Sequence, residues 1–238
     1  MEPVAKAAPA GALVVAVDGP GGSGKSTVAR EVARRRGLRY LDTGAMYRAI
    51  TYLVLDSRVD IDDADAIAEV ADRAVLTVRT EPERPGILAN AVSVDDQIRT
   101  RAVTNAVSAV AAVPAVRRKL VAQQQRIIAE SLPAGGIVVE GRDIGAVVAP
   151  QAQVKVFLTA STEVRALRRS QQLGEKGMDD VARTLAELDR RDALDSGRAA
   201  DPLAVADGAV VLDSTGLAVD QVVEPILRLC QEALAATR

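Results

Sequence analysis

The sequence of 238 residues predicts an α/β fold, in which helices cover both faces of a parallel sheet. Short, continuously apolar runs alternate with longer stretches of helical periodicity, as they do when the strands of a parallel sheet are buried on both faces. The first run leads directly into the glycine-rich stretch GPGGSGKST at residues 19–27, which a helical pattern follows. Residues 60–100 break this alternation with short runs typical of antiparallel strands, which predicts a small inserted lobe.

Five apolar runs predict the strands of the sheet, at residues 12–17, 38–42, 135–141, 154–160 and 209–215, all expected to be buried. Helices are expected at about 26–36, 44–55 and 218–235. The first of them ends on three arginines followed by Gly37, and cations with a trailing glycine stabilise helix C-termini. Pro114 should end or kink the long helical region after the insert.

The composition excludes several kinds of chemistry. The chain has no histidine, which rules out His general bases, Ser-His-Asp triads and His-ligated zinc. Its one cysteine, Cys230, cannot form a disulfide within the chain and is expected to be a buried, unreactive side chain. Any reaction must therefore use carboxylates, arginines, lysines, hydroxyls and a hard cation.

Charge and hydropathy also limit the partners. The net charge is −2, and the chain has one Phe, three Tyr and no Trp, which predicts neither general attraction to nucleic acid nor a stacking platform for it. No apolar stretch approaches the ~20 residues that span a membrane. We therefore expect a cytoplasmic protein without nucleic-acid or membrane partners. Residues 1–11 are rich in Ala and Pro and are expected to form a loose tail.

The glycine-rich stretch fits the pattern G-x-x-x-x-G-K-[ST] of the phosphate-binding P-loop. Glycines let backbone N–H groups turn toward phosphate oxygens, Lys25 adds a positive charge, and Ser26 offers a hydroxyl to Mg²⁺. These features predict ATP and Mg²⁺ as ligands. The expected nucleotide-binding residues are Gly19, Pro20, Gly21, Gly22, Ser23, Gly24, Lys25, Ser26 and Thr27.

A P-loop alone is compatible with a kinase, a GTPase switch, a motor ATPase or a regulator. The N-K-x-D motif that reads guanine is absent. The strand GIVVEG ends in Glu140, where a motor ATPase usually carries an aspartate, which weakens that interpretation.

Arginines recur just after predicted strands, where ligands of such sheets bind, and once more late in a helical pattern. They form four groups: Arg48 after LDTG; Arg142 with Asp143 after GIVVEG; Arg165, Arg168 and Arg169 after VKVFLTA; and Arg191, Asp195 and Arg198 at i, i+4, i+7. The third group is also compatible with a solvated helix face, and the fourth with ordinary ion pairs along a helix. Their common position favours a site that neutralises a phosphoryl group in transfer.

Nearly the whole chain resembles the bacterial cytidylate (CMP/dCMP) kinases. The resemblance is carried by AVDGPGGSGKST, YLDTGAMYR, DQIRT, VSAVAAVPAVR, VVEGRDIGAVVAP, VKVFLTAS with RALRR, RRDALDSGRAADPL and VLDST. It implies a single P-loop kinase domain over residues 12–238. Within it, the resemblance implies a core (about 12–42, 132–160 and 205–238), a lobe that binds the nucleoside monophosphate (about 43–131, with the insert near 60–100) and a helical lid (about 161–204).

The resemblance also implies roles for individual residues. Transfer from ATP to CMP, and to dCMP, would use Lys25, Arg142, Arg165, Arg168 and Arg169 as catalytic groups. The residues that would bind the acceptor are Thr43, Tyr47, Arg48, Ser108, Arg117, Arg142, Asp143, Arg191, Asp195 and Arg198. Among these, Ser108, Arg117 and Asp143 would read cytosine, because a carboxylate accepts from its amino group and opposes the carbonyl that uracil has there.

Two positions depart from the family pattern. Thr43 stands where many relatives have serine, which keeps the hydroxyl, and Ala91 stands where relatives often have a hairpin glycine, which puts the turn geometry in doubt. The remaining alternatives are another small-molecule kinase, of UMP or shikimate type, and a nucleotide-dependent switch or ATPase without an acceptor. The absence of sustained heptads, together with the resemblance, predicts a monomer.

Overall fold

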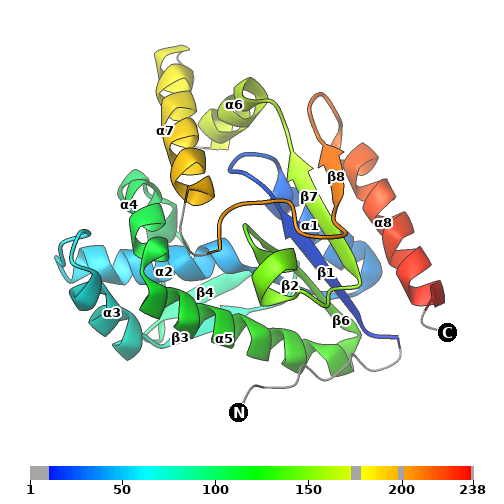
Figure 1. Cartoon of the computed structure of the whole chain (residues 1–238), viewed down its shortest axis with the longest axis horizontal. Coiled ribbons are helices and arrows are strands. Elements are labelled where there is room, and N and C mark those ends of the chain that lie inside the picture. Colours follow the sequence, from blue (N-terminus) through cyan, green and yellow to red (C-terminus); the bar gives the residue numbers. More distant parts are fainter. Residues whose placement is uncertain (1–10, 173–177, 198–200, 237–238) are drawn as a thin grey trace.

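A five-stranded parallel sheet forms the centre of the molecule in the computed structural model, which describes residues 11–172, 178–197 and 201–236 (Figure 1). The strand order is β2-β6-β1-β7-β8. The bounds are β1 Leu13–Asp18, β2 Arg39–Asp42, β6 Gly136–Gly141, β7 Val154–Thr159 and β8 Val210–Asp213. All five predicted strands are confirmed, with ends that shift by one or two residues.

The side chains of β1 explain why the sheet needs helices on both faces. Val14 and Ala16 belong to a buried cluster with α2 (Thr43–Asp56) and α5 (Pro114–Ser131). Leu13, Val15 and Val17 belong to a second cluster with α1 (Lys25–Arg36) and α8 (Val219–Ala236). Because successive side chains of a strand point to opposite faces, a continuously apolar strand requires cover on both sides.

The predicted burial is wrong for β8. Val210 and Val211 are 39% and 53% exposed, whereas the strands on the other side of β7 are buried. β8 pairs only with β7 and so forms one edge of the sheet. At the other edge, β2 is buried, and there the Tyr40 N–H donates to the Thr80 carbonyl of the insert. An apolar run alone does not distinguish an edge strand from a central one.

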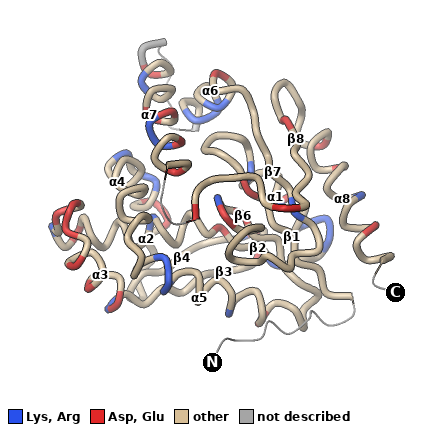
Figure 2. Tube along the Cα trace, viewed as in Figure 1, with Lys and Arg blue, Asp and Glu red and all other residues tan. Residues whose placement is uncertain are grey.

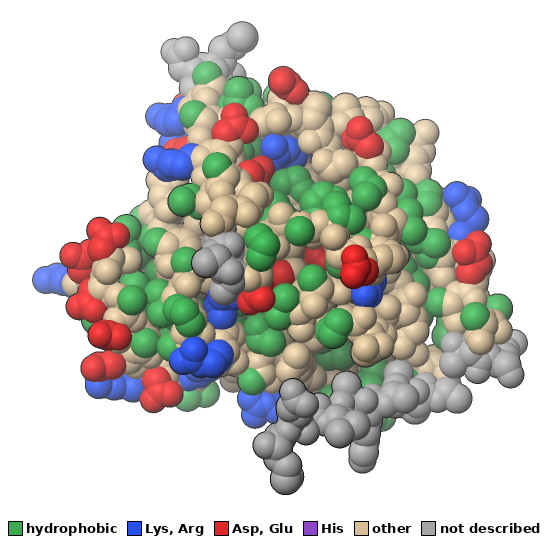
Figure 3. All heavy atoms as spheres, in the orientation of Figure 1, with side chains coloured by type: hydrophobic (Ala, Val, Ile, Leu, Met, Phe, Trp, Pro, Cys, Tyr) green, Lys and Arg blue, Asp and Glu red, His purple; other side chains and the backbone are tan. Residues whose placement is uncertain are grey.

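The insert is a small lobe beside α2. Helix α3 (Ala64–Arg73) precedes the antiparallel strands β3 (Leu76–Arg79), β4 (Gly86–Ala89) and β5 (Val92–Ser93). Asn90 and Ala91 join β4 to β5 with φ values of 50° and 66°. The hairpin therefore keeps its left-handed turn without a glycine, at a cost of about 1–2 kcal/mol for the alanine. The surface around α3 is rich in acidic side chains (Figure 3).

The remaining helices complete the lobe and the predicted lid. Pro114 is the first residue of α5 and separates it from α4 (Arg101–Ala112), as predicted. Helices α6 (Thr162–Gln172) and α7 (Met178–Ser196) stand together at the end of the sheet where the P-loop lies (Figure 1). Arginines are frequent along α6, and α7 carries both arginines and acidic residues (Figure 2). No helix in the described ranges is both long and apolar enough to cross a bilayer.

A turn that the sequence did not predict follows β6. It is a π-helical segment, η3 (Ile144–Val148), and it begins directly after Arg142 and Asp143. The carboxylate of Asp18, at the end of β1, accepts hydrogen bonds from the backbone N–H groups of Ile144 and Gly145, both at 2.8 Å. Asp18 thereby fixes how the chain leaves the sheet at this point.

Candidate active site

The P-loop joins β1 to α1 at the carboxyl end of the sheet. Lys25 Nζ donates to the Pro20 carbonyl at 2.6 Å, and Ser23 Oγ donates to the same oxygen at 3.0 Å. A Cβ at Gly22, where φ is 76°, would lie 2.7 Å from the Arg165 carbonyl, so the approach of α6 requires glycine here. Burial, together with the charge of Arg142, lowers the pKa of Lys25. A phosphate beside this lysine would raise its pKa again.

Glu140, at the end of β6, links the P-loop to β2. Ser26 Oγ donates to Glu140 Oε2 at 3.0 Å, and the Tyr40 hydroxyl donates to Glu140 Oε1. Burial raises the pKa of this carboxyl, and Asp42 adds to the effect. Sequence reasoning used Glu140 only as evidence against a motor ATPase and assigned no role to Tyr40. The sequence signal for this cluster was Glu140 itself, a carboxylate at the end of an apolar strand.

Thr43 and Arg48, on the first two turns of α2, contact different elements: Thr43 contacts β6, and Arg48 contacts α4. The Asp42 side chain caps this helix by accepting from the Ala45 N–H at 3.0 Å, and Thr43 Oγ1 donates to the Glu140 carbonyl at 2.7 Å. Arg48 Nη1 donates to Thr104 Oγ1 on α4 at 3.0 Å. Burial, and then the charge of Arg169, lowers the pKa of Arg48 to about 10.

Arg117 and Asp143 form a buried ion pair between α5 and the end of β6. Their side chains are 5% and 6% exposed, and Arg117 Nη2 donates to Asp143 Oδ2. Arg117 Nε also lies 2.8 Å from Asp201 Oδ2, and its guanidinium group lies 5.8 Å from the centre of the Tyr47 ring. Ser108 lies apart from this pair and donates to Asp195 Oδ1 on α7 at 3.0 Å.

Three arginines of the predicted site hydrogen-bond directly to P-loop carbonyls. The distances are 2.7 Å from Arg142 Nη1 to Gly19 O, 3.1 Å from Arg165 Nη1 to Gly21 O and 3.5 Å from Arg168 Nη1 to Ser23 O. A solvated face therefore does not describe Arg165, which is 6% exposed.

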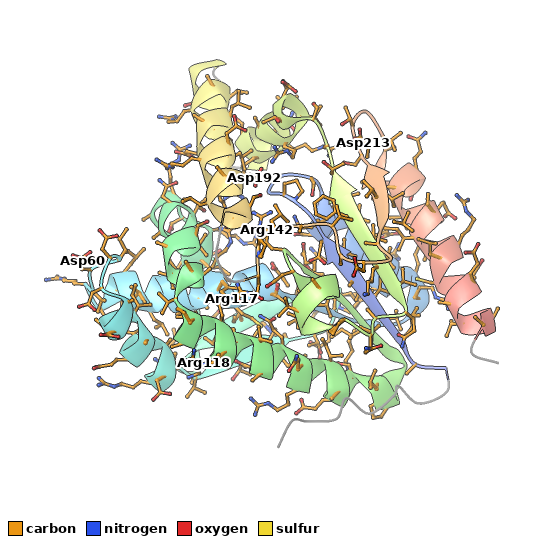
Figure 4. All side chains as sticks on the ribbon, in the orientation of Figure 1. Asp60, Arg117, Arg118, Arg142, Asp192 and Asp213 are labelled. Carbon is orange, nitrogen blue, oxygen red and sulfur yellow. The ribbon has the colours of Figure 1, made fainter. Side chains whose placement is uncertain are left out.

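Carboxylates of α7 accompany these arginines. Asp192 pairs with Arg165, and its second oxygen lies 4.0 Å from Arg142 Nη2, so the aspartate stands between two arginines (Figure 4). Asp195 Oδ2 lies 2.8 Å from Arg142 Nε and 3.7 Å from Arg191 Nε. Burial, and then the charge of Arg142, lowers the pKa of Arg191. Arg198 lies outside the described residues.

Comparison with known proteins gives the family. Residues 15–232 match the family model described as cytidylate kinase. The chain belongs to the cytidylate kinase family. A cytidylate kinase from Rhodococcus opacus (strain B4) is 52% identical over 221 residues, 92% of this chain and 95% of that protein. One from Nocardia farcinica is 50% identical over 224 residues, 94% of this chain and 95% of that protein. The resemblance predicted from the sequence motifs is thus confirmed.

The donor set of this cytidylate kinase family member fits Mg²⁺ held mainly by a nucleotide. Within the described ranges, no group of three or more acidic or cysteine side chains forms a metal cage. Mg²⁺ retains several waters and is usually bound by one or two protein groups plus substrate phosphates. Ser26, hydrogen-bonded to Glu140 beside the P-loop, provides such a position. A surface hollow of about 310 Å³ between β7, β8 and α8 contains none of the predicted site residues.

Proposed function

We propose that this protein transfers the γ-phosphoryl group of ATP to CMP, and also to dCMP, yielding ADP and CDP or dCDP. Family membership supports the reaction. One observation carries the assignment to this site: the two adjacent residues after β6 reach different partners. Arg142 hydrogen-bonds to the P-loop, whereas Asp143 pairs with the buried Arg117. Groups suited to a phosphate and to a base are thereby adjacent.

On the ATP side, the backbone of the P-loop and Lys25 would bind the phosphates, while Ser26 and Glu140 would hold Mg²⁺. When bound, this ion would neutralise charge on the phosphates. Arg142, Arg165, Arg168 and Arg169 would cover the transferring group with positive charge. No general base is needed, because the acceptor phosphate is already anionic.

On the acceptor side, the phosphate would lie against Arg48 and Arg142, the sugar hydroxyls against Asp195 and Arg191, and the base beside Ser108, Arg117 and Asp143. A carboxylate accepts from the amino group of cytosine but opposes the carbonyl of uracil, which disfavours UMP. The carboxylates Asp192 and Asp195 already pair with the arginines, so we expect CMP and ATP to replace part of these ion pairs.

We also propose that the enzyme is a monomer and acts in the cytoplasm. Its low aromatic content and net charge of −2 support small-molecule substrates over nucleic acid. Closure of α6 and α7 over the P-loop would exclude water and limit hydrolysis of ATP without an acceptor.

The test is ADP formation from Mg·ATP with CMP, dCMP, UMP, AMP, GMP or no acceptor. Strong turnover with CMP and dCMP alone is expected. Turnover with UMP or AMP in place of CMP would overturn the assignment of the base-reading residues. A rate indifferent to every acceptor would contradict the kinase function and leave an ATPase or switch.

A further inference from the structure

Thr104 on α4 connects two arginines that come from different parts of the chain. Its Oγ1 accepts from Arg48 Nη1 of α2 at 3.0 Å and from Arg169 Nη2 of α6 at 3.3 Å. Helices α2 and α4 belong to the lobe that would bind the acceptor, and α6 belongs to the predicted lid. The hydroxyl of Thr104 is therefore a direct link between lobe and lid. Sequence analysis did not single it out.

Two guanidinium groups donate to this one uncharged oxygen. Within the described part of the chain, no carboxylate lies within ion-pair distance of Arg48. The charges of Arg169, Arg142 and Arg99 all lower its pKa, and only Asp42 opposes them among the main contributions. Positive charge gathered in this way around Arg48 favours an anion at this place.

The proton of the Thr104 hydroxyl is available as a third donor. A hydroxyl has two acceptor lone pairs and one O–H. Arg48 and Arg169 both donate to the oxygen, and none of the described residues accepts the Thr104 proton. Three donors from α2, α4 and α6 thus meet at one place, which suits the several oxygens of a phosphate.

We infer that Thr104 belongs to the site of the acceptor phosphate: its oxygen holds Arg48 and Arg169 together, and its O–H donates to an oxygen of a phosphomonoester dianion. The inference rests on the proposed function, because it concerns the phosphate of the nucleoside monophosphate. It also explains how the lid detects the acceptor, since Arg169 reaches the same hydroxyl as Arg48.

The test replaces Thr104 by Val, which has nearly the same shape but no hydroxyl, and by Ser, which keeps the hydroxyl. Binding of CMP and of cytidine, which lacks the phosphate, is measured by calorimetry. Thr104→Val should weaken CMP binding about tenfold or more, the loss expected for one hydrogen bond to a charged group, and leave cytidine binding unchanged. Thr104→Ser should bind CMP within about threefold of the unmodified protein.

Thr77→Val on β3 is the matched control, because Thr77 is exposed and lies in the same lobe. It should change neither affinity. Thr104→Ala should weaken CMP binding in the same way as Thr104→Val, and it replaces Thr104→Val in the test if that variant does not fold. Equal weakening of CMP and cytidine would show a merely structural role, and unchanged CMP binding in both variants would also overturn the inference.

The turnover of the unmodified protein separates the two proposals. If CMP accelerates ADP formation but loss of the Thr104 hydroxyl leaves CMP affinity unchanged, only the inference about Thr104 fails. If CMP neither binds nor accelerates ADP formation, the proposed function and the inference fail together.

Discussion

Replacing Asp143 by Asn tests base recognition with a minimal change of shape. The side chain keeps its volume and one carbonyl oxygen but loses its charge. Arg117, its partner, keeps a second carboxylate, because Arg117 Nε lies 2.8 Å from Asp201 Oδ2. We therefore expect a folded protein whose unfolding free energy is lower by about 1–3 kcal/mol, the usual effect of weakening one buried, charge-assisted hydrogen bond.

The expected effect on specificity has two parts. With CMP, a hydrogen bond to a charged oxygen (about 1.5–3 kcal/mol) becomes a neutral one (about 0.5–1.5 kcal/mol), which lowers kcat/KM about tenfold. With UMP, the amide can turn and donate to the uracil carbonyl, which removes a penalty of about 1–3 kcal/mol and raises kcat/KM about tenfold. Together these changes reduce the preference for CMP over UMP about a hundredfold.

The assay compares kcat/KM for CMP and UMP at saturating Mg·ATP. Asp201→Asn is the matched control, because it makes the same chemical change at a residue that contacts the same arginine. Asp201 is 33% exposed by side chain and has φ 50°, a conformation that Asn tolerates. The control should leave the CMP:UMP ratio within about threefold of the unmodified protein. If Asp143→Asn also leaves the ratio unchanged while it lowers stability, Asp143 supports the fold and does not read the base.

Three further predictions concern buried or loop-bound groups. Burial raises the pKa of Asp18 from 3.8 to about 6, so the folded protein binds this proton more tightly than the unfolded chain does. At about 1.4 kcal/mol per pKa unit, the free energy of unfolding should fall by about 3 kcal/mol in all as the pH rises through both pKa values, and by about 2 kcal/mol of this between pH 4 and pH 6. Denaturant titrations should show this component missing in Asp18→Asn, and an identical pH dependence would contradict it. Ser26→Ala should raise the Mg²⁺ concentration for half-maximal rate several-fold at fixed ATP, whereas Ser26→Thr should not; equal Mg²⁺ dependence of both would exclude Ser26 as a ligand. Cys230 is fully buried, and burial raises the pKa of its thiol to about 11, so a thiol reagent near pH 8 should react at least about a hundredfold more slowly with the folded protein than in denaturant.

The sequence was most informative where the physical cause is local. Continuous apolar runs predicted the five strands, because a strand that is covered on both faces carries apolar side chains at successive positions. The helix stop at Gly37 and the break at Pro114 were predicted from backbone chemistry that involves neighbouring residues only. Burial of β8 was predicted wrongly, because exposure at a sheet edge depends on which strands pair and not on the composition of the strand itself.

Partners of the polar side chains were harder to predict. The P-loop was recognised because its residues are consecutive. The hydrogen bonds of Glu140 with Ser26 and Tyr40 depend on β6 lying between β1 and β2, which no local pattern reveals. The hydrogen bond from Ser108 to Asp195, which joins α4 to α7, was likewise not predicted from the sequence. Such contacts are set by the packing of whole helices.

The sheet order also explains why two predicted functions meet at one point. Asp18 ends the strand that leads into the P-loop, and its carboxylate binds the two backbone N–H groups that directly follow Asp143, 126 and 127 positions away in sequence. Asp18 therefore fixes the turn from which Arg142 reaches the P-loop while Asp143 reaches Arg117. If the turn loosened, both contacts would be lost together, since the two residues are adjacent. A substitution at Asp18 should accordingly weaken ATP-side and acceptor-side functions in parallel, although Asp18 need not touch either substrate.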